Sequence, residues 1–466
     1  MQRPATLGEL RASGYQPCRV KDEIRRNLLK RLAARQPLFT EMVGYESTVL
    51  PELTHALLAR HDLLLLGTRG QGKTRLLRQL VDLLDEWVPA VAGTDLRDDP
   101  LAPISAHALE LIARHGDQTP VVWLSRQDRY LEKLATPDVT MTDLFGDVDL
   151  RKHVEGRSLA EEGALHFGLI PRANRGIFCI NELPDLSPRI QVGLFNLLQE
   201  RDVQIRGYPV RFALDVCLVF SANPEDYTSR GRIVTPLKDR IGSVVRTHYP
   251  ASRAEGIAIT DSNVVPRVDG IPVQVPHFLK EVIEELVRRA RSSPAVNQQS
   301  GVSARLAISA RELLVSCAER RALLLGETEA VARVSDLSAV FAGARGKLEL
   351  LLDEEGGQED RLVADLLREA IRIVFTDLVP LERLQGIRDW FTAGNRFTVG
   401  ESVTVAEILA QLQHAEPLLR CVRELLPPTA ATPAWLASGA EFLLEGLHLY
   451  GQLNKQRTDQ RHIFGK

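Results

Sequence analysis

The sequence predicts an α/β fold in which helices flank a parallel sheet, and α-helical regions follow this fold along the chain. Short apolar runs recur in the first ~250 residues: LLLLG at 63–67, PVVWLS at 120–125, GIFCIN at 176–181 and VCLVFSAN at 216–223. Helical patterns separate these runs, and this alternation is typical of a parallel sheet that is buried on both faces. After Pro250 the strand signal fades. Residues 277–291 and 304–325 have helical repeats, and Ser303 is the expected N-cap of the second.

Composition sets the broad class and the expected compartment. A chain of 466 residues exceeds what one core usually supports, so two or three domains are expected, and 44% hydrophobic with 26% charged residues is typical of a globular protein. The formal charge of -3 gives no reason to expect nucleic acid or an anionic membrane as partner. The five cysteines have no C-x-x-C spacing, and no stretch approaches the ~20 apolar residues of a membrane helix. These features favour a cytoplasmic protein.

The octapeptide that follows the first apolar run predicts a phosphate-binding loop. It fits G-x-x-x-x-G-K-[ST] between an expected strand and an expected helix, and it consists of Gly67, Thr68, Arg69, Gly70, Gln71, Gly72, Lys73 and Thr74. Glycine lets the backbone N–H groups turn toward an anion, and the helix amino terminus adds partial positive charge. We expect these residues to bind ATP, with Lys73 on the β and γ phosphates and the Thr74 hydroxyl on Mg²⁺.

Polar residues end two other expected strands. GIFCIN ends at Asn181 and is followed by Glu182, at the sheet edge where ligands of parallel sheets bind. We expect Glu182 to act as general base toward the attacking water, and Asn181 to lie on the metal side with Thr74. An amide is a poorer partner for Mg²⁺ than a carboxylate, which predicts slow hydrolysis. Asn223, at the end of VCLVFSAN, is expected to position the γ phosphate or the water.

A basic segment after Asn223 supplies a further candidate. In PLKDRIG, Arg240 is the side chain that we expect to reach across a subunit boundary and stabilise charge on the γ phosphate. A solvated basic surface is the alternative interpretation.

Together the phosphate-binding loop, GLIPRANRGIFCINELPDL, GLFNLLQERDVQIRG, FSANPEDY and PLKDRIG resemble the MoxR and magnesium chelatase ATPase-subunit branch of the AAA+ proteins. The resemblance covers residues 42–325. It implies a P-loop AAA+ sheet, places Asn223 as first sensor and Arg240 as finger, and suggests Arg305, in GVSARLA, as second sensor. The family has aspartate at the position of Asn181.

The resemblance also organises the chain into four expected parts. These are an N-terminal helical arm at 1–45, an AAA+ core at 46–250 with a helical insertion near 138–175, a helical lid at 251–350, and a C-terminal helical region at 351–466.

The resemblance further implies partners and an activity. Its members assemble as rings, commonly hexamers, work with a von Willebrand factor A-type partner, and use ATP hydrolysis to remodel or activate a protein client. Two alternatives stay open: a magnesium chelatase subunit that drives Mg²⁺ insertion into protoporphyrin, and a nucleotide-dependent switch that hydrolyses ATP weakly.

Overall fold

A computed structural model describes residues 3–148, 165–205, 211–224, 233–267, 269–298, 300–351, 357–430, 432–458 and 460–466. The chain divides into two compact units, Met1–Tyr249 and Pro250–Lys466. The helical insertion expected near 138–175 lies partly outside the described residues, which omit 149–164. In the described part of the chain, no helix has both the length and the apolar character needed to cross a membrane.

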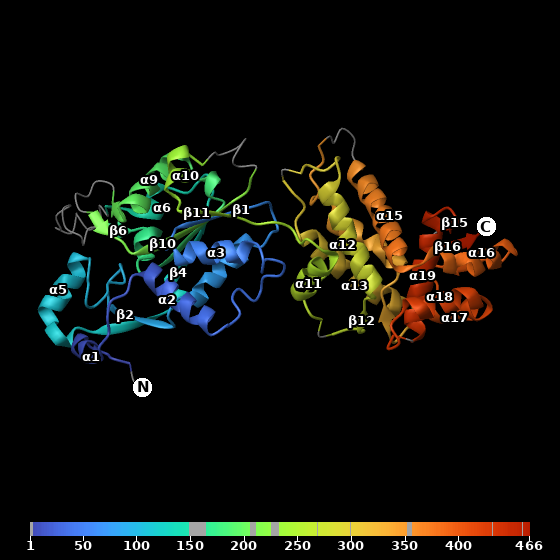
Figure 1. Ribbon diagram of the computed structural model, residues 1–466, viewed down its shortest axis with the longest axis horizontal. Coiled ribbons are helices and arrows are strands. Elements are labelled where there is room, and N and C mark those ends of the chain that lie inside the picture. The colour runs from blue at the N-terminus through green and yellow to red at the C-terminus, as the bar shows by residue number, and fades with distance from the viewer. Residues whose placement is uncertain are drawn as a thin grey trace. The chain divides into compact units, whose positions relative to one another are not determined.

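The first unit is built on a parallel sheet with the strand order β11-β1-β10-β7-β4. Figure 1 labels its strands β1, β4, β10 and β11. Its strands are β1 (Leu63–Leu66), β4 (Tyr130–Leu134), β7 (Gly176–Asn181), β10 (Val216–Ala222) and β11 (Ser243–Arg246). The predicted α/β class with a parallel sheet is therefore confirmed. The runs that formed the three inner strands are apolar at almost every position because both of their faces are buried.

Alternate strand residues enter two separate apolar cores. Leu63, Leu65 and Cys179 face one core, together with helices α2 (Val20–Ala33), α3 (Val49–Leu58) and α4 (Lys73–Arg78). Leu64, Phe178 and Phe220 face the other core, together with α6 (Met141–Phe145), α8 (Leu169–Arg172) and α9 (Pro188–Gln199). Helices thus cover the sheet on both sides.

The run at 120–125 corrects one expectation. It forms β3 (Val121–Ser125), which pairs antiparallel with β2 (Trp87–Val91) outside the parallel sheet. Val122 is 43% exposed, although the residues around it are apolar. A short apolar run alone therefore does not show whether a strand lies in the main sheet or outside it. The sheet strands β4 and β11 were not expected, since their sequences, YLEKL and SVVR, mix charged and apolar residues.

The remaining elements of this unit are α1 (Leu7–Ala12), η1 (Gln79–Leu83), α5 (Ala106–His115), η2 (Gly116–Gln118), η3 (Gln127–Arg129), β5 (Gly146–Val148), β6 (Leu165–Phe167), η5 (Leu183–Asp185), β8 (Asp202–Gln204), β9 (Arg211–Ala213) and α10 (Thr235–Arg240).

The second unit is mainly helical, as expected. Its helices are α11 (Arg253–Asn263), α12 (His277–Ser292), α13 (Arg305–Leu325), η7 (Val334–Ala339), α14 (Val340–Ala344), α15 (Gln358–Leu378), η8 (Leu381–Leu384), α16 (Gln385–Thr392), α17 (Val405–His414), α18 (Glu416–Leu425) and α19 (Pro433–Leu449). Ser303 is not the N-cap of α13: that position belongs to Ala304, and the Ser303 hydroxyl accepts a hydrogen bond from the Arg305 amide at 3.2 Å.

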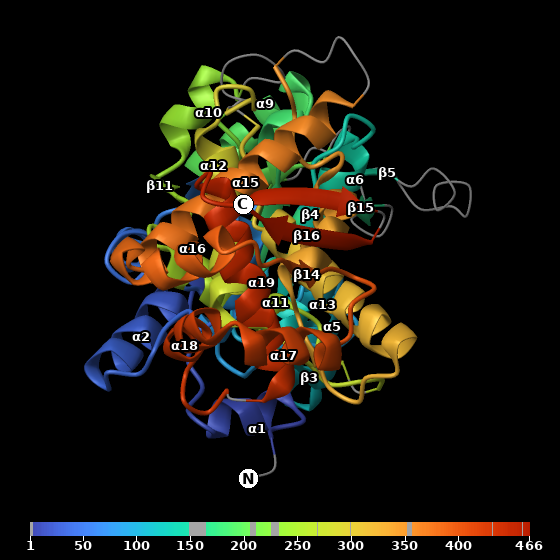
Figure 2. The same ribbon diagram turned by 90° about the vertical axis from the view of Figure 1, so that its right-hand side faces the viewer.

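Two small sheets in this unit were not expected. One joins β12 (Val273–Gln274) and β13 (Ala330–Val331), and the other has the order β14-β16-β15, from β14 (Phe397–Val399), β15 (Asn454–Thr458) and β16 (Arg461–Gly465) (Figure 2). Helix α19 packs against α15, α17 and α18, and its Phe442 stacks on Phe278 of α12 with ring centroids 4.5 Å apart.

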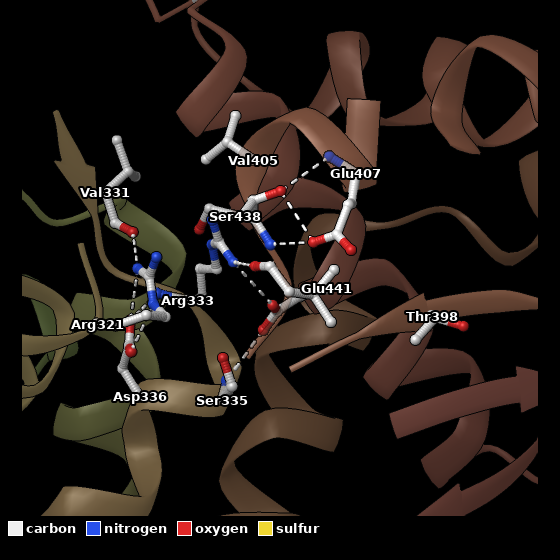
Figure 3. A network of polar contacts seen from close by, with 12 residues as sticks. Arg321, Val331, Arg333, Ser335, Asp336, Thr398, Val405, Glu407, Ser438 and Glu441 are labelled. Atoms are coloured by element: carbon white, nitrogen blue, oxygen red, sulfur yellow. Dashed lines mark hydrogen bonds and ion pairs between the residues drawn. The ribbon is translucent and has the colours of Figure 1, made fainter. Parts of the chain in front are cut away.

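A buried polar network joins α13, η7 and α19 (Figure 3). The Asp336 carboxylate, 0% exposed, accepts from Arg321 Nε (3.0 Å), Arg321 Nη2 (3.1 Å) and the Arg333 amide (2.7 Å). Glu441 on α19 accepts from the Ser335 amide at 3.0 Å, and burial raises the pKa of its carboxyl. Buried charges cost free energy unless they are paired, so each of these partners depends on the others.

Removing Asp336 should therefore destabilise the second unit strongly. We expect Asp336→Ala to lower the free energy of unfolding by about 3–5 kcal/mol, because it leaves Arg321 buried without its main counter-charge. Asp365→Ala is the matched control: Asp365 pairs with Arg368 on the exposed surface of α15, so the loss should stay within about 1 kcal/mol. Urea unfolding followed by circular dichroism measures both. Equal losses in the two variants would contradict a structural role for the network.

Candidate nucleotide-binding site

The loop between β1 and α4 has the backbone conformation that its glycines predict. Gly70 and Gly72 have φ values of 75° and 74°, in the left-handed region that side chains other than glycine rarely adopt. Helix α4 begins at Lys73, directly after Gly72. The sequence therefore forms a tight turn that delivers Lys73 and Thr74 to the sheet edge at the end of β1.

Side chains from three segments pack around the buried Gly67. Gln71 donates from Nε2 to Thr68 Oγ1 (2.7 Å) and accepts at Oε1 from the Thr247 hydroxyl (2.6 Å). The Tyr45 hydroxyl donates to the Gln71 carbonyl at 2.6 Å, and burial raises the pKa of Tyr45 to about 12. A Cβ atom at position 67 would collide with Thr247 Oγ1 and Gln71 Oε1. The loop is therefore held in shape by contacts that require glycine at this position.

The Lys73 ammonium lies inside the loop. It donates to the Gly67 carbonyl (2.5 Å), the Thr68 carbonyl (3.0 Å) and Asn223 Oδ1 (2.9 Å). Asn223 can reach it because β1 and β10 are neighbours, with Leu66 opposite Ala222. The structure thus brings together two residues that are 150 positions apart in the sequence and that we expected to share one phosphate group.

Oxygen atoms converge on the metal side of the loop. Asn181 Oδ1 accepts from the Thr74 hydroxyl at 3.4 Å and from the Ser221 hydroxyl at 3.0 Å, and Asn181 is only 6% exposed. Hydroxyl and amide oxygens are ligands suited to Mg²⁺, which keeps several waters and takes the rest of its ligands from phosphate. Within the described ranges no group of three or more His, Cys, Asp or Glu side chains is placed to hold a metal alone. The residues present fit a Mg²⁺ ion that arrives with a nucleotide.

Glu182 follows β7 in an unusual backbone conformation. Its φ of 56° and ψ of 48° lie in the left-handed region, and the residue is exposed. The Ser221 hydroxyl accepts from the Glu182 amide at 3.1 Å, and the Glu182 carbonyl accepts from the Asp185 amide at 2.9 Å. Burial and then the neighbouring Glu182 carboxylate raise the pKa of Asp185. These two bonds hold the Glu182 backbone in a left-handed conformation that non-glycine residues rarely adopt.

Of the two predicted arginines, Arg240 lies in the first unit, where it contacts residues of α9 and α10. Arg240 ends α10, donates to Gln199 Oε1 (3.0 Å) and the Pro236 carbonyl (2.8 Å), and lies over the Phe195 ring at 4.9 Å. Arg305 is the exposed first residue of α13, in the second unit. Their proposed roles as finger and second sensor stay predictions.

Sequence reasoning missed a carboxylate next to the metal side. Glu132 on β4 accepts from Asn181 Nδ2 at 2.6 Å and from Arg78 at 2.8 and 3.0 Å. The segment RYLEKL has no regular alternation of apolar and polar residues, so no local pattern places Glu132 on a strand. Ser221 and Thr247, which orient Asn181 and Gln71, were also missed, and nothing in their local sequence marks them.

Comparison with known proteins indicates the class of this chain. Residues 121–241 match the model of the family described as AAA domain (dynein-related subfamily). The chain is 29% identical over 231 residues to magnesium-chelatase subunit ChlI from Nostoc sp., covering 47% of this chain and 56% of that protein. It is 30% identical over 190 residues to subunit ChlI-1 from Arabidopsis thaliana, covering 38% of this chain and 40% of that protein. The chain thus spans about half the length of the curated relatives that it matches.

Solved structures are more distant. A structure of the complex between subunits BchI and BchD of magnesium chelatase is 22% identical, with a TM-score of 0.35, covering 71% of this chain and 100% of that chain. NtrX from Brucella abortus in complex with ATP is 14% identical, with a TM-score of 0.41, covering 83% of this chain and 72% of that chain. TM-scores this low carry no argument about the chain as a whole.

The parallel sheet, the loop after its first strand and the polar residues at the ends of β7 and β10 define a P-loop domain of the AAA+ ATPase class. Within that class the chain is similar to magnesium-chelatase subunits ChlI, which are its curated relatives.

The packing around Gly67 generates a direct test of the loop. We expect Gly67→Ala to weaken ATP binding on the order of tenfold or more, because the new methyl group displaces Thr247 and Gln71 and distorts the loop. Titration with a fluorescent ATP analogue measures the affinity. Gly465→Ala is the control, since its Cβ would make only an ordinary contact at 3.8 Å. Unchanged affinity in Gly67→Ala would show that the loop does not hold the nucleotide.

Proposed function

We propose that the chain binds ATP with Mg²⁺ and couples ATP hydrolysis in a ring assembly to the remodelling or activation of a protein client. The observation that carries this proposal is the convergence of Lys73, Thr74, Asn181 and Asn223 at one sheet edge. The similarity to magnesium-chelatase subunits ChlI supports it. We also propose the roles of the individual site residues, a partner protein like those of the MoxR group, and a protein client.

Each residue of the site has a role that its position permits. Lys73 neutralises charge on the β and γ phosphates, while Asn223, already bonded to Lys73, orients the γ phosphate or the attacking water. Thr74 and Asn181 hold the metal side, where bound Mg²⁺ would supply charge neutralisation for the phosphate oxygens. Glu182 projects an exposed carboxylate from the end of β7, and it takes the proton of the attacking water.

Two arginines connect the proposed ATP hydrolysis to assembly of a ring. Arg240 reaches the nucleotide of a neighbouring subunit and stabilises charge on its γ phosphate, so hydrolysis requires assembly. Arg305 of the second unit acts as second sensor, so that nucleotide state moves the helical unit. We propose a hexameric homo-oligomer that works with a von Willebrand factor A-type partner protein.

Two alternatives share the same site. A magnesium chelatase subunit that drives Mg²⁺ insertion into protoporphyrin is motivated by the curated relatives, whose names describe that enzyme. A weakly hydrolysing switch is motivated by Asn181, whose amide replaces a carboxylate beside Thr74. Phosphate release at background level, despite saturable ATP binding and ring assembly, would select the switch.

The general-base role of Glu182 is tested by Glu182→Gln. We expect steady-state phosphate release to fall on the order of 10²-fold or more, because the amide cannot accept the proton of water, while ATP affinity stays unchanged. The exposed residue Glu110 on α5 provides the control variant Glu110→Gln, which should retain full turnover. Equal turnover in wild type and Glu182→Gln would remove Glu182 from the mechanism.

A further inference from the structure

Helix α4 presents two side chains to the sheet edge from one face. Thr74 and Arg78 are four residues apart, a spacing that places them on the same side of a helix. Thr74 donates to Asn181 Oδ1 on β7, and Arg78 forms a two-point pair with the Glu132 carboxylate on β4. Asn181 Nδ2 also donates a hydrogen bond to Glu132 Oε1 at 2.6 Å, so the four side chains form one continuous network. Helix α4 therefore contacts two neighbouring strands, through the amide of Asn181 and the carboxylate of Glu132.

The two ends of the Asn181 amide have opposite preferences. A carboxylate can only accept hydrogen bonds, so Glu132 requires the NH₂ end of the amide. The oxygen end is then directed to the hydroxyls of Thr74 and Ser221. The reverse orientation would place the amide oxygen against the carboxylate and the NH₂ group on the metal side, where a cation repels it. Glu132 thus selects the one orientation in which Asn181 offers an oxygen.

Glu132 is itself held firmly. Its two oxygens accept from Nε and Nη2 of Arg78, and its side chain is 22% exposed, on the edge strand of the sheet. The same contact raises the pKa of Arg78. A carboxylate that is fixed on both oxygens cannot turn away from Asn181 without losing part of the pair with Arg78.

We propose that Glu132 is a positioning residue of the metal side: it orients the Asn181 amide oxygen toward Thr74 and supplies, from β4, the negative charge that β7 lacks. The inference rests on the proposed function, because it concerns the same nucleotide site. It also changes the interpretation of Asn181. The amide of Asn181 on β7 is paired with the carboxylate of Glu132, which lies on the neighbouring strand β4.

The pair predicts how substitutions combine. Asn181→Asp alone replaces the amide donor to Glu132 with a second carboxylate, and two carboxylates at this distance repel each other. Glu132→Gln alone leaves two amides and no carboxylate. The double variant Glu132→Gln with Asn181→Asp restores one carboxylate and one amide in exchanged positions.

The test is a double-mutant cycle on metal-dependent nucleotide binding. ADP affinity of the full chain is measured by isothermal titration calorimetry with Mg²⁺ and, separately, with EDTA, for wild type, the two single variants and the double variant. The increase in ADP affinity on adding Mg²⁺ should be about tenfold smaller in each single variant than in wild type. In the double variant this increase should recover to within about threefold of the wild-type value. Affinity in EDTA should be the same in all four proteins, which also shows that each is folded.

The outcomes separate this inference from the proposed function. If wild type binds ADP and Glu132→Gln retains its full Mg²⁺ dependence, or if the losses of the two single variants simply add in the double variant, the inference is overturned while the nucleotide site stands. If wild type binds no ADP in either condition, the proposed function fails and the inference fails with it. Glu110→Gln serves as control for a carboxylate-to-amide change elsewhere in the first unit, and should behave as wild type.

Discussion

Parallel strands end at the same edge of a sheet, and the site of this chain depends on how three of those ends are aligned. Leu66 of β1 lies opposite Ala222 of β10, and Phe220 of β10 lies opposite Ile180 of β7. The ends of the three strands are therefore level to within one residue. This alignment lets an ammonium that follows β1 reach an amide that follows β10, and a hydroxyl on α4 reach the last residue of β7.

Buried charges also join helix α2 to the sheet. Glu23 of α2 forms a two-point pair with Arg129, at 2.8 and 2.6 Å, and both side chains are almost fully buried. Asp62, just before β1, pairs with Lys21 at 2.6 Å and accepts from the Leu218 amide of β10 at 2.9 Å. Such pairs add little net stability, but breaking one leaves a buried charge, so they fix the position of α2 relative to β1 and β10.

The sequence was most informative where one local pattern determines the structure. The loop from Gly67 to Thr74 and the apolar strands β1, β7 and β10 were predictable because glycine conformation and burial on both faces leave clear signals. The edge strands β4 and β11 were not, since half-exposed strands mix charge with apolar residues. Glu132 was missed for a second reason: its partners Arg78 and Asn181 lie 54 and 49 positions away, and only the strand order brings them together. The small sheet of β14, β15 and β16 likewise depends on pairing between distant segments.

We infer that the turn after β1, with the ammonium of Lys73, is a pocket for a nucleoside triphosphate. Isothermal titration calorimetry of the full chain with ATP and Mg²⁺, repeated on Lys73→Ala, tests it most directly. The account predicts saturable heat with one ATP per chain for wild type and a loss of that heat in Lys73→Ala, whose folding is checked by circular dichroism. Absence of saturable heat in wild type, or an unchanged isotherm in the folded variant, would contradict it.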